Sequence, residues 1–156
     1  MRFGDVVTAV ASVIVIDILL DSVLLAVLVP VNSYYAPDIA GIISILVASL
    51  IVGYVFAAKI QEESRKGAIG RIVILSTVVM TFGTMALFAN PYTGAAINES
   101  LEDMFSTSGW TTWDWVAYSQ FLMVMLVAMN VVLVLVFGFI GLYAGSMLRK
   151  PAKSAK

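Results

Sequence analysis

Four long apolar runs divide this chain of 156 residues, at about residues 6–30, 39–59, 71–89 and 116–148. A helix needs roughly 20 residues to cross a hydrocarbon core about 30 Å thick, and each run is about that long or longer. The mean hydropathy is +1.00 and 61% of the residues are hydrophobic, above the roughly 45 to 50% apolar share of soluble domains. We therefore predict an all-α integral membrane protein, in which residues 1–156 form a single transmembrane domain built as a four-helix bundle.

The basic residues all fall on one side of the predicted membrane. The nine Lys and Arg lie at the N-terminus, around the second link or in the tail 149–156: Arg2, Lys59, Arg65, Lys66, Arg71, Arg149, Lys150, Lys153 and Lys156. The first and third links carry acids and no basic residue: Asp38, Glu99, Glu102, Asp103 and Asp114. Because cytoplasmic loops carry an excess of Lys and Arg, this distribution predicts a protein of the cell membrane with both termini in the cytoplasm.

The longest predicted outer link spans residues 90–115. Ser100 followed by Asp103 resembles a helix-start capping pair, which predicts a short amphipathic helix lying on the bilayer. Four aromatic residues mark the entry of the fourth helix: Trp110, Trp113, Trp115 and Tyr118. They are typical of anchors in the interfacial layer, and a ligand-binding aromatic site is the alternative. Asn98 matches the N-glycosylation pattern on the predicted outer side, and its modification stays an open question.

Small residues indicate where helices approach closely. Gly53 belongs to a small-residue stripe that includes Ser49 on the second helix. The fourth helix carries a glycine face that would serve internal packing or a partner equally well: Gly138, Gly141 and Gly145. The fourth run has about 33 residues and would be roughly 50 Å long as a helix, so it must tilt or protrude.

The first apolar run contains two acids, Asp17 and Asp21, where a membrane helix normally has none. Their i, i+4 spacing puts both carboxyls on one face, one turn apart. A charged side chain at mid-bilayer costs roughly 2.5 to 3.5 kcal/mol on insertion scales. We therefore expect this face to turn toward other helices or a wet cavity, and away from lipid.

Every predicted helix also brings a polar side chain to the same depth. Counting from charged or proline-marked ends places four residues near the centres of their helices: Asp17, Ser49, Thr81 and Asn130. Thr77 and Thr84 lie on the same stripe of the third helix as Thr81, at i, i+4 and i+7 spacing. The sequence therefore predicts one polar layer halfway through the membrane.

Two interpretations of this layer stay open. In the structural one, Asp17 is neutral, because an apolar medium disfavours a charged carboxyl, and it donates a hydrogen bond to Asn130 or a threonine. In the functional one, Asp17 and Asp21 bind or relay a cation or a proton. The neutral oxygen ligands would then come from Asn130, Ser49 and Thr81. No Lys or Arg lies inside the apolar part of a predicted helix to pair with either acid.

The composition excludes several kinds of chemistry. With no Cys there are no disulfides, thiolate metal sites or thiol catalysis, and with no His the commonest metal ligand and acid–base group is missing. We therefore expect no enzymatic activity, cofactor, metal site or nucleic-acid partner. The first hypothesis is an accessory or scaffold subunit of a larger membrane complex, with the lipid bilayer, other membrane subunits or further copies as partners. The alternative is a small oligomeric cation or proton channel or transporter that uses Asp17 and Asp21.

The predicted threading resembles that of tetraspanins, which also have four spans, inside termini and a larger second outer link. The resemblance is confined to topology. The cysteine motif of the large tetraspanin loop is absent, and the corresponding loop is shorter here.

Overall fold

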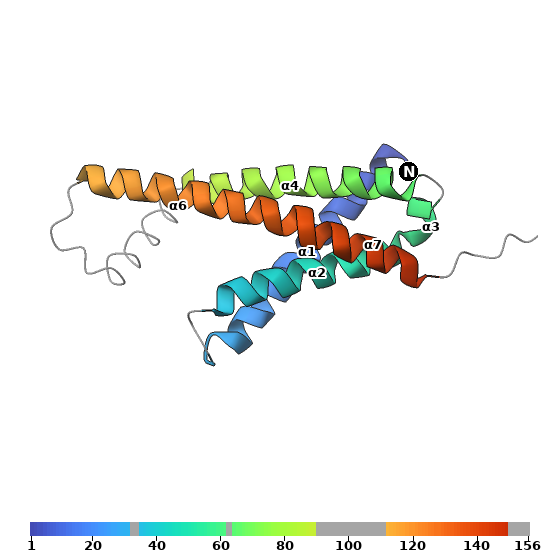
Figure 1. The fold of residues 1–156 in the computed structure, drawn as a ribbon, viewed down its shortest axis with the longest axis horizontal. Coiled ribbons are helices and arrows are strands. Elements are labelled where there is room, and N and C mark those ends of the chain that lie inside the picture. The colour runs from blue at the N-terminus through green and yellow to red at the C-terminus, as the bar shows by residue number, and fades with distance from the viewer. Residues whose placement is uncertain (32–34, 62–63, 90–111, 150–156) are drawn as a thin grey trace, which may run out of the picture. The chain divides into compact units, whose positions relative to one another are not determined.

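The computed structural model describes residues 1–31, 35–61, 64–89 and 112–149. Every regular element within these ranges is helical (Figure 1): α1 (Phe3–Leu28), α2 (Ala36–Val55), α3 (Ala57–Gln61), α4 (Arg65–Ala89), α6 (Thr112–Leu133), the π-helical turn η1 (Val134–Gly138) and α7 (Phe139–Leu148). Four helical stretches are long and apolar enough to cross a membrane: Phe3–Leu28, Asp38–Val55, Arg65–Ala86 and Met123–Leu148. The prediction of an all-helical protein with four apolar spans is confirmed.

The first two helices begin earlier than the apolar runs suggested. α1 begins at Phe3, because the backbone N–H of Arg2 donates to Oδ2 of Asp5 at 3.2 Å, and a carboxylate is favourable near a helix N-terminus. α2 begins at Ala36 with Pro37 in its first turn, where the missing N–H of proline leaves no helical bond unmade.

The second predicted helix, 39–59, is divided at Phe56. The backbone of Phe56 has φ −90° and ψ 6°, outside α-helical geometry, and α3 then continues to Gln61. Ala57 and Ile60 of α3 are both 0% exposed. The short helix therefore contributes to the core, although its sequence lies next to charged residues.

The third helix also begins earlier than predicted, at Arg65 and not at residue 71. Its first turns contain Ala68 and Ile69, which are 0% exposed, and the N–H of Ala68 donates to the carbonyl of Ser64 at 2.9 Å. The prediction treated residues 60–70 as a polar link because of their charges. Burial of the apolar side chains between those charges stabilises helix there.

The chain forms two compact units: Met1–Val78 with Val132–Lys156, and Val79–Val131. In the first unit, α2 is the central helix, because it contacts α1 as well as η1 and α7 (Figure 1). Most of the buried residues that the structure describes in α2 are small. They are Ala36, Ala40, Ser44, Ala48, Ser49 and Gly53, and the larger Ile45 and Val52 are buried with them. Both neighbours can therefore lie close to its backbone.

The contact between α2 and α7 is made by glycines. A Cβ atom placed on Gly53 would lie 2.9 Å from Cα of Leu142, and one on Gly141 would lie 2.8 Å from Cβ of Ser49. A Cβ on Gly145 would lie 2.9 Å from the carbonyl carbon of Leu50. Distances below 3.0 Å leave no room for any side chain. Three of the four predicted packing glycines thus lie where two helix backbones of this chain meet. At the fourth, Gly138, an added Cβ atom would lie 3.6 Å from Oγ of Ser49, which is an ordinary contact distance.

Candidate functional site

The carboxyl of Asp17 lies in the packed face of α1. Helical spacing places Asp17 in line with Val6, Val10 and Val13, which are 1 to 5% exposed, and Asp17 itself is 7% exposed. The opposite side of α1 carries exposed apolar side chains. The acid is therefore turned toward the rest of the first unit, as the cost of placing a charge in lipid requires.

The partner of Asp17 is Ser44 of α2. The hydroxyl Oγ of Ser44 lies 2.7 Å from Oδ1 of Asp17 and 3.2 Å from the backbone carbonyl of Gly41, and Ser44 is 1% exposed. A serine hydroxyl has one proton, so this geometry allows two arrangements. Either Ser44 donates to a charged Asp17, or a neutral Asp17 donates to Ser44 while Ser44 donates to Gly41.

The prediction named Asn130 or a threonine as the partner of Asp17, and it did not name Ser44, which the structure pairs with this acid. Depth along the second predicted helix indicates Ser49, which lies at its centre. Ser44 and Ser49 are five positions apart, which is about 140° around a helix with 3.6 residues per turn. Ser44 therefore faces α1, whereas Ser49 lies beside Gly141 of α7.

Asp21, one turn further along α1, has different surroundings. It is half-buried, and its carboxyl makes no hydrogen bond with any residue that the structure describes. Within the same described residues, no group of three or more Asp, Glu, His or Cys side chains lies close enough to hold a metal ion. The two acids thus lie on the same face of α1, but only Asp17 is buried and hydrogen-bonded within the described part of the chain.

Asn130 is bonded within the second unit. Its Nδ2 donates to Oγ1 of Thr84 at 3.0 Å, and Thr84 donates to the carbonyl of Met80 at 3.0 Å. Thr81 is half-buried on the same stretch of α4. Thr77 belongs to the first unit and donates to the carbonyl of Val73 at 2.9 Å. The predicted threonine stripe therefore spans the boundary between the two units, and the structure pairs Asn130 with Thr84.

Two buried serine hydroxyls have no hydrogen-bond partner within the described part of the chain. They belong to Ser49, which is 0% exposed, and Ser76, which is 1% exposed. Leaving a buried hydroxyl unpaired costs about 1 to 3 kcal/mol. Sequence reasoning identified Ser49 but missed Ser44 and Ser76. The signal for Ser44 was available, since Ala40, Ser44 and Ala48 form a second stripe of small residues at i, i+4 spacing.

Polar contacts also join several helix ends of the first unit. Lys59 of α3 forms an ion pair with Asp5 of α1. The amide Nε2 of Gln61 donates to the carbonyl of Ser146 at 2.9 Å, next to the end of α7. The start of α1, the short α3 and the end of α7 therefore lie together at one end of this unit, which we call the basic end.

Several predicted features lie outside the described residues: the amphipathic helix expected within 90–115, Asn98, Trp110 and the tail from residue 150. Trp113, Trp115 and Tyr118 fall in α6. Comparisons with models of protein families, with curated proteins and with solved structures give no match for this chain.

Proposed function

We propose that the chain is a non-enzymatic protein of the cell membrane, with both termini in the cytoplasm, that acts by association as an accessory or scaffold subunit of a larger membrane complex. The observation that supports this proposal is the position of the Asp17 carboxyl between two packed helices. Its carboxyl is 7% exposed and is bonded to a neutral hydroxyl inside the contact between α1 and α2. An acid in this setting stabilises helix packing, whereas an acid that conducts ions needs access to water.

The outward side of α1 is the surface that we assign to a partner. A shallow cleft of about 310 Å³ lies there, lined by Thr8, Ala11, Ser12, Val15 and Ile16. Thr8 donates to the carbonyl of Gly4 and Ser12 to that of Thr8, both at 2.8 Å, so both hydroxyls are satisfied by their own helix. Small residues let a second backbone approach closely. The occupant that fits is a transmembrane helix of another subunit.

Filling the cleft tests this assignment. Ala11→Leu places a bulky side chain in the lining of the cleft, and Val23→Leu, at a site that is 62% exposed outside the cleft, is the matched control. We expect Ala11→Leu to reduce the stoichiometry of co-purifying subunits about tenfold, while helicity and membrane insertion stay unchanged. Val23→Leu should leave the stoichiometry as it is. A wild-type protein that is a monomer in nanodiscs of its own membrane lipids would refute the proposal, and assembly only with further copies would identify the partner as this same chain.

A second candidate, a small oligomeric cation or proton conductor, is favoured by one feature of the same site. The arrangement of Asp17, Ser44 and Gly41 permits two proton positions, and Asp21 is one turn away with no hydrogen-bond partner among the described residues. Proton or cation flux into proteoliposomes that disappears in Asp17→Asn and Asp21→Asn would establish this function in place of the first.

A further inference from the structure

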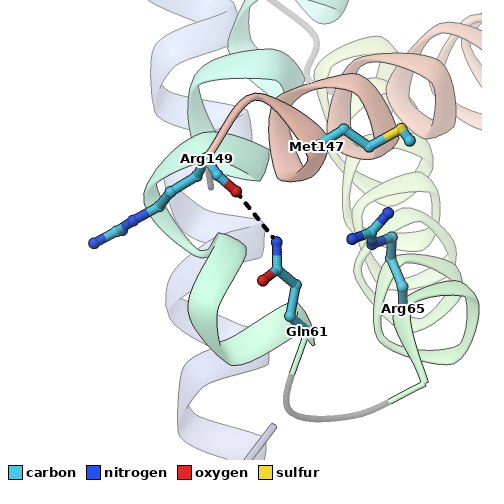
Figure 2. Close-up of a pocket in the computed structure, with 4 residues that line it drawn as sticks. All are labelled: Gln61, Arg65, Met147 and Arg149. Carbon is cyan, nitrogen blue, oxygen red and sulfur yellow. Dashed lines mark hydrogen bonds between the residues drawn. The ribbon is translucent and has the colours of Figure 1, made fainter. Parts of the chain in front are cut away.

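A cleft of about 430 Å³ lies at the basic end of the first unit, between α3, α4 and α7. Its lining residues are Gln61, Arg65, Met147 and Arg149 (Figure 2). Gln61 donates through Nε2 to the carbonyl of Ser146 at 2.9 Å and lies 3.5 Å from that of Arg149. These bonds fix α3 against the end of α7, so two walls of the cleft are held in place.

Arg65 supplies the positive charge of the cleft. Its guanidinium carbon lies 5.8 Å from the centre of the Tyr143 ring, which is stacked on Phe139 at 6.1 Å. Such a cation–π contact holds the planar group without using its hydrogen-bond donors. In Figure 2 the side chains of Arg65 and Gln61 point toward α7, whereas the guanidinium of Arg149 points away from both.

No carboxylate neutralises this charge within the part of the chain that the structure describes. Neither Arg65 nor Arg149 forms an ion pair there, and Asp5, an acid at the same end, is paired with Lys59. Arg149 donates to the carbonyl of Val55 at 3.2 Å and adds a second positive charge nearby. Guanidinium groups bind planar oxyanions by two parallel hydrogen bonds, and phosphate is such a ligand.

The position of the cleft along the helices indicates the source of the phosphate. Arg65 is the first residue of one apolar span, and Leu148 is the last residue of another. The cleft therefore lies at the ends of two apolar spans, where we expect the lipid headgroups to be. Met147, which lines the cleft, and Leu148, the next residue in the chain, are 57% and 64% exposed and offer apolar surface to an acyl chain. Basic pockets between transmembrane helices are a recognised site for anionic headgroups.

We propose that this cleft binds the phosphate group of an anionic phospholipid, with Arg65 as its principal ligand. The inference does not depend on the association proposed above, because it needs only that the protein is embedded in a bilayer. Gln61 would contribute the fixed wall, and Arg149 would contribute long-range attraction.

Native mass spectrometry of the full chain in mild detergent tests the proposal, with equal amounts of phosphatidylglycerol and phosphatidylcholine. Arg65→Gln removes the ligand, and Lys66→Gln removes the same charge from an exposed neighbour that does not line the cleft. We expect preference for phosphatidylglycerol in the wild type, a loss of about tenfold in Arg65→Gln and less than about twofold in Lys66→Gln. Arg65→Lys, which keeps the charge but not the fork of donors, should be intermediate.

Inorganic phosphate, added as a second arm, distinguishes the two sources of the same chemistry. If the apolar rim matters, millimolar phosphate leaves lipid binding unchanged; if phosphate displaces the lipid in proportion to its concentration, the free ion is the ligand of the same site. Circular dichroism of each variant verifies that the helices are intact. Equal binding of the two lipids, or equal losses in Arg65→Gln and Lys66→Gln, would overturn the proposal.

Discussion

At the scale of single residues, Asp17 and Asp21 differ in what surrounds them although they lie one turn apart on α1. Asp17 is buried against Ser44, whereas Asp21 is half-buried and has no hydrogen-bond partner among the described residues. A buried polar group without a partner is costly, so Ser44 allows an acid to occupy the α1–α2 contact. A substitution that removes hydrogen bonding should therefore destabilise the fold more at position 17 than at position 21.

Asparagine and leucine at position 17 separate the two candidate functions. Asn can still hydrogen-bond with Ser44, so we expect Asp17→Asn and Asp21→Asn to keep the fold and the assembly of the wild type. Asp17→Leu loses the bond and should weaken helix association by about 1 to 2 kcal/mol, measured by reversible unfolding in detergent. If the Asn variants instead abolish ion flux in proteoliposomes with the fold intact, the acids conduct and the association proposal fails.

The sequence revealed that Asp17 must turn inward, because the cost of a charge in lipid depends only on residue type. It did not reveal the partner, which depends on the rotation of α2 about its own axis. Ser44 and Ser49 are both plausible by depth, and only the packed structure shows that the side of Ser44 faces α1. The pairing of Asn130 with Thr84 was missed because it depends in the same way on the rotation of α4 and α6 about their own axes.

At the scale of elements, the four spans could be predicted because length and hydropathy determine them. The ends of the helices could not, since burial of Ile69 and Ile60 among charged neighbours depends on tertiary contacts. The division at Phe56 has no clear signal in the sequence. The glycine face of the fourth run was visible, but its choice of neighbour was not, and the structure places Gly141 and Gly145 against α2.

Close packing of α2 on α7 gives a prediction at this scale. Gly145→Ala introduces a Cβ 2.9 Å from the carbonyl carbon of Leu50, so the backbones must separate. We expect a loss of about 1 to 3 kcal/mol in unfolding free energy, as for other overpacked cores. Gly70→Ala is the matched control, because nothing lies within 4 Å of its Cβ, and it should stabilise α4 by up to about 1 kcal/mol. Equal stability of the two variants in a denaturant titration would show that the α2–α7 contact is looser than described.

At the scale of the whole molecule, the distribution of charge is the property that most directly determines threading. Lys59 forms an ion pair with Asp5, and Arg149 donates to the carbonyl of Val55. Basic residues from different helices therefore lie together at the basic end, as their positions in the sequence predicted. Which side of the membrane this end faces is a separate matter. The excess of Lys and Arg favours the cytoplasm.

Cysteine labelling tests the orientation, and the chain offers a clean background because it contains no Cys. Single cysteines at Ser33 and Ser108 lie in the predicted outer links, and those at Ser64 and Ser154 lie on the basic side. Since a charged thiol reagent does not cross the bilayer, we expect intact cells to label the first pair and spare the second, with all four labelled after permeabilisation. Ser64 is exposed in the structure, so a lack of labelling there in intact cells reflects the membrane and not burial. The opposite pattern would place the basic end, and with it the cleft at Arg65, on the outer face, against the predicted orientation.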